Sequence, residues 1–193
     1  MKIIVIDNYD SFTYNLVHMV QAILKQKIDV VRNDQIELTK IAEYDKIILS
    51  PGPGVPEQAG ILKEIIRQYA PAKSILGVCL GMQAIAEVFG AKLFNLKDVY
   101  HGIASEIQHT QRDYLFQGIS EKFMAGRYHS WIVQQKELPD CLQVTATDSM
   151  NQIMALSHKH YDFKGVQFHP ESVLTEDGEQ IIRNFLFSNQ SGE

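Results

Sequence analysis

Residues 74–90 read SILGVCLGMQAIAEVFG, and they say more about the architecture than any other stretch of the chain. The first six residues, 74–79, form a largely apolar run, which is typical of a parallel strand covered on both faces. The apolar residues that follow recur at helical spacing: Met82, Ile85, Ala86 and Phe89. Gly90 is then placed to end the helix. The stretch therefore predicts a buried strand, a sharp turn at Cys79 and a helix in direct succession.

Strand and helix patterns alternate on both sides of this stretch. Further apolar runs predict strands at 2–7, 28–33, 46–50 and 164–169. Helical spacing and capping signals predict further helices behind Asp10 and Ser11, from Pro56 to about Tyr69, and behind Thr175. The rest of the second half reads as short strands and turns. This alternation favours an α/β fold with a mainly parallel sheet and right-handed crossovers.

Length and composition bound the organisation of the chain. It has 193 residues, of which 45% are apolar, enough for one good core, so we expect a single domain over residues 1–193. No apolar stretch is long enough for a signal peptide or a membrane span. The two cysteines, Cys79 and Cys141, do not suggest a disulfide framework. We therefore expect a soluble protein in the reducing cytoplasm.

The charge pattern excludes some classes of partner. The net charge is −5, from 18 basic and 23 acidic residues that are intermixed along the chain. Nucleic acids and anionic membranes are bound through clusters of lysine and arginine, which this sequence lacks. Neither is expected as a partner, and small molecules or another protein remain.

Four of the predicted strands end in residues that can carry chemistry. Asp7 and Asn8 follow the first strand, a Gly/Pro loop (residues 50–54, SPGPG) follows the third, Cys79 ends the fourth, and the segment 169–171 ends the last. In a parallel sheet, sites form at the carboxyl ends of the strands. We expect these four segments to meet along one edge of the sheet.

Cys79 lies between Gly77 and Gly81 in a Gly-x-Cys-x-Gly pattern, the form of a nucleophile elbow, where glycines permit a sharp strand-to-helix turn. The start of a helix also favours the thiolate. The pentapeptide alone fits equally well with a buried cysteine that packs as a small apolar residue. His169 and Glu171, spaced to project to one side of an extended segment, would supply a base and its orienting carboxylate. Together these residues predict a Cys-His-Glu triad.

The Gly/Pro loop could be mistaken for a phosphate-binding loop. It lacks the Gly-Lys-Ser/Thr ending of a P-loop, and its prolines have no N–H to donate. It can offer one rigidly held amide, from Gly52 or Gly54, which with the amide of Leu80 would make an oxyanion hole. No set of histidines, cysteines and carboxylates has recognisable ligand spacing, so no metal is expected.

Five motifs together resemble the class I, triad-type glutamine amidotransferases: DNYDSFTYNL (7–16), SPGPGVPEQAG (50–60), GVCLGMQA (77–84), RYHS (127–130) and GVQFHPES (165–172). The resemblance implies a flavodoxin-like three-layer α/β sandwich. It makes Cys79 the nucleophile, His169 the general base and acid, and Glu171 the residue that orients the histidine. It implies no cofactor in this chain.

The same resemblance assigns residues to the substrate, L-glutamine. The amides of Gly52 and Leu80 match the oxyanion hole, while Gln83, Ser130 and Trp131 fall where the family holds the glutamine backbone groups. Two positions depart from the commoner pattern. Met82 stands where many relatives have histidine, and Trp131 replaces a leucine; we expect these changes to affect packing more than chemistry.

Within the family, the motifs fit best the glutaminase subunits of the chorismate-using synthases. The resemblance therefore implies a partner, a chorismate-binding synthase large subunit expected to need Mg²⁺, docked near residues 7–14 and the Gly/Pro loop. The implied product is anthranilate, for tryptophan biosynthesis; the alternative is aminodeoxychorismate, for folate biosynthesis, or one subunit shared by both synthases. Readings from other classes are a flavodoxin-like binding module, and a γ-glutamyl hydrolase or cysteine peptidase.

Overall fold

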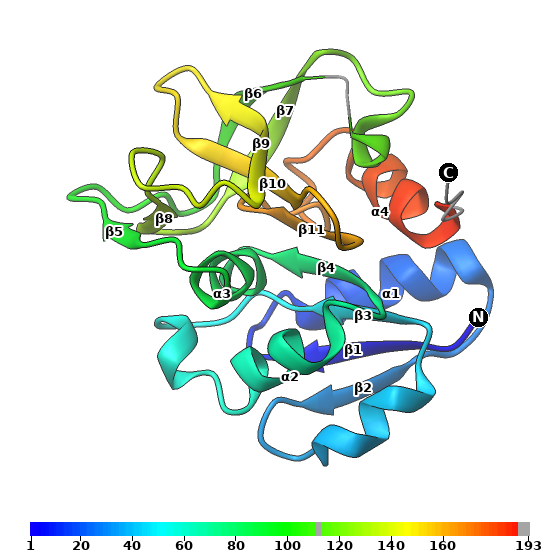
Figure 1. The fold of residues 1–193 in the computed structure, drawn as a ribbon. Helices are drawn as coiled ribbons and strands as arrows, with labels where there is room; N and C mark the ends of the chain where they lie inside the picture. Colours follow the sequence, from blue (N-terminus) through cyan, green and yellow to red (C-terminus); the bar gives the residue numbers. More distant parts are fainter. Residues whose placement is uncertain (111–112, 189–193) are drawn as a thin grey trace.

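The computed structural model describes residues 1–110 and 113–188, and in this part of the chain a nine-stranded sheet forms the centre of the molecule (Figure 1). The strands lie in the order β2-β1-β3-β4-β11-β10-β9-β6-β7. The parallel half consists of β1 (Ile3–Asp7), β2 (Asp29–Arg32), β3 (Lys46–Leu49), β4 (Ser74–Val78) and β11 (Phe163–Val166). These strands confirm the predicted parallel sheet.

The remaining strands extend the sheet as an antiparallel half. They are β6 (Ile103–His109), β7 (Lys122–Arg127), β9 (Leu142–Asp148) and β10 (Ile153–His158). A separate two-stranded ribbon pairs β5 (Leu93–Asn95) with β8 (Trp131–Val133). The sequence predicted only short strands and turns for this half. In the structure, the β10–β11 pair joins it to the parallel half.

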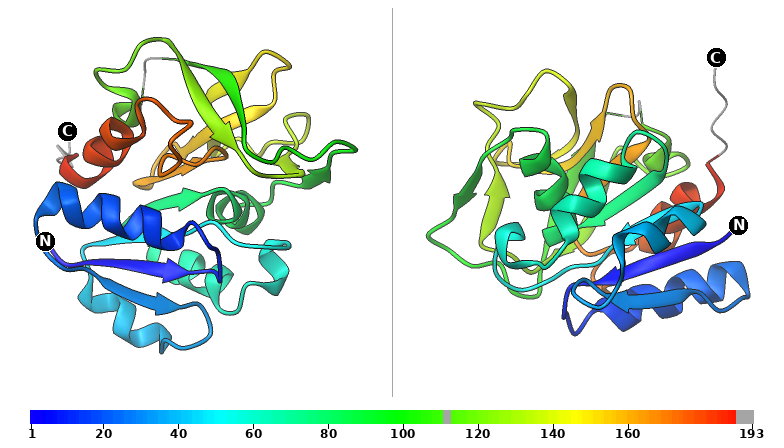
Figure 2. Two further views of the ribbon diagram at one scale, coloured as in Figure 1. Left: turned by 180° about the vertical axis from the view of Figure 1, so that it is seen from behind. Right: turned by 60° about the horizontal axis from the view of Figure 1, so that its bottom comes forward.

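Helices cover both faces of the parallel half. The helices are α1 (Thr13–Leu24), α2 (Leu62–Tyr69), α3 (Leu80–Val88) and α4 (Gly178–Phe187), with short 3₁₀ turns at Leu38–Glu43, Pro56–Gln58 and Tyr114–Phe116. Figure 2 shows α1 and α4 on the face opposite α2 and α3. None of the helices in the described part of the chain is long and apolar enough to cross a membrane.

The strand β1 shows how sequence builds the three layers. Its residues are all buried, and successive side chains point to opposite faces of the sheet. Ile3 and Val5 pack in the core that α1 and α4 cover, whereas Ile4 and Ile6 pack in the core beneath α2 and α3. The predicted three-layer sandwich is confirmed.

The turn from β4 into α3 depends on two glycines. A Cβ atom on Gly77 would lie 2.5 Å from the carbonyl carbon of Gly81, and one on Gly81 would lie 2.6 Å from the carbonyl oxygen of Leu49. Between them Cys79 has φ 51° and ψ −103°, a backbone conformation that residues with a side chain rarely adopt. The predicted elbow at Cys79 is therefore present, and backbone-to-backbone packing holds it.

Some predicted boundaries and caps differ from the structure. The helix expected from Pro56 is broken by Gly60, at φ 54°, and restarts as α2. The strand expected over 164–169 leaves the ladder after Val166. Neither α1 nor α4 has a side-chain cap, since the carboxylate of Asp10 accepts from the N–H of Phe12 in the preceding turn and the hydroxyl of Thr175 donates to the carbonyl of His169.

We expect Gly77→Ala to lower the free energy of unfolding by about 3 kcal/mol, because the new methyl group meets fixed backbone atoms rather than a movable side chain. Chemical denaturation measures the change. Gly118→Ala is the matched control: Gly118 has φ 78° but open space around it, so this variant loses only about 1 kcal/mol from backbone strain. Equal losses in the two variants would contradict the packing argument.

Candidate active site

The four predicted strand ends meet at one edge of the sheet. The N–H of Asn8, after β1, donates to the hydroxyl of Ser50, after β3, at 2.8 Å, and its side-chain amide donates to the Ser50 carbonyl. Gly52 lies against both Asn8 and the side chain of Leu80, the first residue of α3. This packing places the Gly/Pro loop beside the turn that carries Cys79.

A pocket of about 300 Å³ opens at this edge, at the lower end of the size range of small-molecule sites. Its lining combines the Gly/Pro loop, the start of α3, the segment before β6 and the segment before β8. The residues that line it are Gly52, Pro53, Gly54, Cys79, Gln83, Val99, Tyr100, His101, Tyr128, His129, Ser130 and Trp131. Six of the eight expected site residues therefore lie in or directly beside one pocket, counting Leu80, which packs on Gly52.

The other two expected site residues, His169 and Glu171, form a buried pair. Nδ1–H of His169 donates to Oε1 of Glu171 at 2.7 Å, and both side chains are almost fully buried. Nε2 of His169 has no conventional hydrogen bond among the described residues. Burial by itself would lower the pKa of His169, but its interactions with the Cys79 thiol and the Glu171 carboxylate outweigh burial and raise this pKa to about 10. The three groups thus form one electrostatic unit.

Aromatic rings enclose the imidazole of His169. Phe12, from the segment between β1 and α1, meets it edge-on with 5.3 Å between ring centroids, and Tyr128 lies at 4.8 Å. The hydroxyls of Tyr128 and Ser172 lie 3.1 Å apart, and the hydroxyl of Thr175 holds the His169 carbonyl. These contacts fix the ring position. Phe12 and Tyr128 lie in two of the motifs quoted above, but the sequence did not indicate that either residue packs on His169.

The amide groups of the pocket wall are already paired with one another. Nε2 of Gln83 donates to the carbonyl of Trp131 at 2.9 Å and to Oε1 of Gln167 at 3.2 Å. Nδ1–H of His129 donates to the same Trp131 carbonyl at 3.1 Å. Both lone pairs of this carbonyl are therefore used within the protein, as are both hydrogens of Gln83 Nε2, which leaves Oε1 of Gln83 to accept from a ligand. The sequence did not single out Gln167.

A buried cation lies behind the pocket wall. Arg127 forms an ion pair with Asp148 at 2.7 Å, donates from Nε to Nε2 of His129 at 3.1 Å, and stacks on the ring of Tyr100, 3.6 Å from its centroid. Since Nε2 of His129 accepts, its Nδ1 must carry the proton. Burial first, and then the charge of Arg127, lower the pKa of His129 to about 3. His129 is therefore a neutral support of the pocket wall.

Met82 is fully buried and packs closely on Gly165 of β11, which agrees with the expectation that this departure concerns packing. Among the residues that the structure describes, no group of three or more histidines, cysteines and carboxylates is placed to hold a metal ion.

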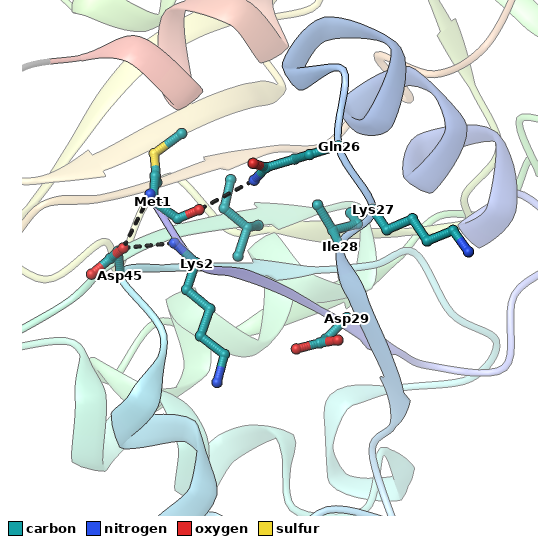
Figure 3. Close-up of a pocket in the computed structure, with 8 residues that line it drawn as sticks. Met1, Lys2, Gln26, Lys27, Ile28, Asp29 and Asp45 are labelled. Carbon is teal, nitrogen blue, oxygen red and sulfur yellow. Dashed lines mark hydrogen bonds and ion pairs between the residues drawn. The ribbon is translucent and has the colours of Figure 1, made fainter.

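A second pocket, of about 320 Å³, lies at the opposite end of the strands (Figure 3). There the N–H of Lys2 donates to Asp45 and the amide of Gln26 donates to the Met1 carbonyl, so its polar groups largely bind one another.

Comparison with known proteins identifies the family of this chain. Residues 4–189 match the family model Glutamine amidotransferase class-I. "Anthranilate synthase component 2" of Pseudomonas aeruginosa is 42% identical, over 95% of this chain and 94% of its own length. "Aminodeoxychorismate synthase component 2" of Escherichia coli K12 is 45% identical, over 95% and 98%. "Bifunctional protein TrpGD" of Thermotoga maritima is also 45% identical, and the chain spans 32% of its length.

Solved structures give the same answer for the fold. A putative GMP synthase component from Thermoplasma acidophilum superposes with a TM-score of 0.86 at 27% identity, covering 96% of this chain and 92% of its own. The chain therefore belongs to the class-I glutamine amidotransferase family. The expected fold and enzyme class are thereby confirmed.

The lowered pKa of His129 makes stability depend on pH. In the unfolded chain this histidine binds a proton below about pH 6.5, whereas in the folded chain it stays neutral down to about pH 3. The free energy of unfolding should therefore fall as the pH drops through this window. Between pH 6 and 4 we expect it to fall more steeply, by up to about 1.4 kcal/mol per pH unit, in the natural protein than in His129→Gln. Parallel pH profiles from chemical denaturation would contradict the assignment.

Proposed function

We propose that the chain is the glutaminase subunit of a chorismate-using synthase, and that Cys79, His169 and Glu171 are its catalytic triad. The observation that carries the triad is the buried hydrogen bond between His169 and Glu171, which lies against Tyr128 of the small-molecule-sized pocket that Cys79 also lines. The synthase assignment is supported by relatives named as component 2 of two such enzymes.

The first half-reaction follows from the charges at the site. With the raised pKa of His169, the thiol proton resides on the imidazole, and Glu171 stabilises the imidazolium. The Cys79 thiolate attacks the side-chain amide carbon of glutamine, and the developing oxyanion is stabilised by the amides of Gly52 and Leu80. The imidazolium then gives its proton to the departing nitrogen. Ammonia leaves, and a glutamyl thioester remains on Cys79.

The second half-reaction regenerates the thiolate. Neutral His169 takes a proton from a water molecule, which attacks the thioester carbon. The carbon–sulfur bond breaks, glutamate is released, and the imidazolium and thiolate are restored. The sum is glutamine and water to glutamate and ammonia.

Recognition of glutamine uses the atoms that the pocket wall leaves unpaired. Oε1 of Gln83 would accept from the α-amino group of the substrate, because both hydrogens of its Nε2 are already used. The N–H of Trp131 and the hydroxyl of Ser130 would donate to the α-carboxylate. The replacement of leucine by Trp131 leaves such a backbone contact unchanged.

The ammonia has to reach a second active site. In neutral water most ammonia is protonated and no longer nucleophilic, so direct transfer to a partner is needed. A chorismate-binding large subunit, itself expected to need Mg²⁺, would dock over the strand ends near residues 7–14 and the Gly/Pro loop. The exposure of Tyr9 and Tyr14 there, and of Val99 and Val173 nearby, supports a protein contact at this edge. Both subunits would work in the cytoplasm.

There are two candidates for the product that the complex makes. We favour anthranilate, for tryptophan biosynthesis, as the product. The partner subunit would form it in a lyase reaction. Aminodeoxychorismate, for folate biosynthesis, is the second candidate, because the relatives named for the two enzymes are 42% and 45% identical to this chain. A subunit shared between both synthases would explain why relatives of both kinds are about equally similar to this chain. Identification of the aminated product of the purified complex decides between them.

We expect Cys79→Ser to abolish glutamine-dependent synthesis in the complex and to leave synthesis from added ammonium salt unchanged, since the serine hydroxyl is not ionised by His169. Product formation with each nitrogen source measures the two activities. Loss of both would mean that Cys79 has a structural role.

We expect His169→Ala to lower the rate of glutamine hydrolysis by about 10³-fold, because both proton transfers are lost. Glu171→Ala should lower it less, since the imidazole remains and only its orientation and charge partner are removed. Steady-state release of glutamate by the complex gives both values. The reverse order of effects would refute the assigned roles.

A further inference from the structure

A chain of buried amide groups connects the pocket wall to the sulfur of Cys79. It begins at the Trp131 carbonyl, passes through the side chain of Gln83 and reaches Oε1 of Gln167. Nε2 of Gln167 lies 3.5 Å from the Cys79 sulfur and donates to it. Gln167 is fully buried, with 0% of its surface exposed, so water offers no alternative partner.

The carbonyl at one end sets the direction of the whole chain. A carbonyl can only accept, so the atom of Gln83 that faces Trp131 is its amino nitrogen. The same nitrogen faces Gln167, and the nearer atom of Gln167 must therefore be its oxygen. The remaining atom of this amide, its N–H group, is then directed at the sulfur. The reversed orientation would set two donors against each other at the Gln83 contact.

The backbone holds Gln167 and Cys79 in fixed relation. The N–H of Gln167 donates to the carbonyl of Met154 at 2.8 Å, and the N–H of Cys79 donates to the carbonyl of Val166 at 2.8 Å. Gln167 is thus anchored to β10, and Cys79 is anchored to the end of β11, which Gln167 directly follows. The side chain of Gln167 therefore meets the sulfur without a change of backbone.

We propose that Gln167 is a positioning residue of this site: its Nε2–H group donates a hydrogen bond to the Cys79 thiolate, in an orientation that Gln83 fixes from the substrate pocket. A hydrogen bond to an anion is stronger than one to a neutral group, and in a buried site the donor stabilises the thiolate relative to the thiol. Gln167 would thus act together with His169. The inference rests on the proposed role of Cys79 as nucleophile.

Alkylation of Cys79 by iodoacetamide, followed as a function of pH, tests the proposal because only the thiolate reacts. All proteins carry Cys141→Ser, so that Cys79 is the only thiol. In Gln167→Met, which keeps the volume and removes the donor, we expect alkylation to slow about tenfold at a pH below the midpoint of the parent protein's profile. The midpoint of the pH profile should move up by roughly one unit. His169 with its partner Glu171, and the titratable residues that share the pocket with Cys79, are the same in every variant; the latter are Tyr100, His101, Tyr128 and His129.

Two further variants separate positioning from general destabilisation. Asn184→Leu removes an amide that bonds the Leu115 and Gln117 carbonyls, away from the pocket, and should lower stability without moving the alkylation profile. Gln167→Leu also removes the donor and adds no charge beside the sulfur. Its midpoint should move up as far as that of Gln167→Met, and if the methionine variant does not fold, the leucine variant carries the test.

The possible results separate a failure of this inference from a failure of the proposed function. If the Gln167 variants keep the natural pH midpoint and differ only in unfolding midpoint, as Asn184→Leu does, then Gln167 is merely structural and the inference is wrong. If alkylation of Cys79 in the otherwise natural protein leaves glutamine hydrolysis in the complex intact, the proposed nucleophile is wrong, whatever the Gln167 variants show.

Discussion

The parallel pairing of β4 with β11 is the interaction on which the candidate site depends. It aligns Val78 with Val166, so that the two strands end side by side although almost half of the chain lies between them. Cys79 follows one strand, and Gln167 and His169 follow the other. Because the N–H of Cys79 donates to the carbonyl of Val166, the pairing continues into the turn itself. A shift of this register would separate the thiol from the imidazole.

The rest of the structure secures what this pairing brings together. From the far side, the antiparallel half contributes Gly126, whose carbonyl accepts from the N–H of His169 and whose N–H donates to Thr175. Gly178, at the start of α4, has no room for a side chain, since a Cβ atom would lie 1.9 Å from the Pro170 carbonyl oxygen. The His169 segment is therefore clamped between a strand and a helix. Both halves of the sheet are needed to shape one pocket in this glutamine amidotransferase.

Local sequence patterns predicted the parallel strands, the turn at Cys79 and the gathering of four strand ends, because apolar runs report burial and glycines report close approach. They failed where a residue had a distant partner. Residues 167–169 read as strand because they are buried, yet they lie outside the ladder. Thr175 carries a capping signal, but its hydroxyl is taken by the carbonyl of His169. Gln167 could have been found, since a glutamine inside a buried run requires partners.

The left-handed backbone of Cys79 has a consequence for how the chain can change. A residue with a side chain is strained at φ 51°, and glycine is the one residue free of this strain. Glycine at this position would ease the turn and remove the thiol at the same time. Since the proposed mechanism needs this thiol, activity and stability make opposing demands on position 79. Under selection for stability alone, glycine would be favoured there.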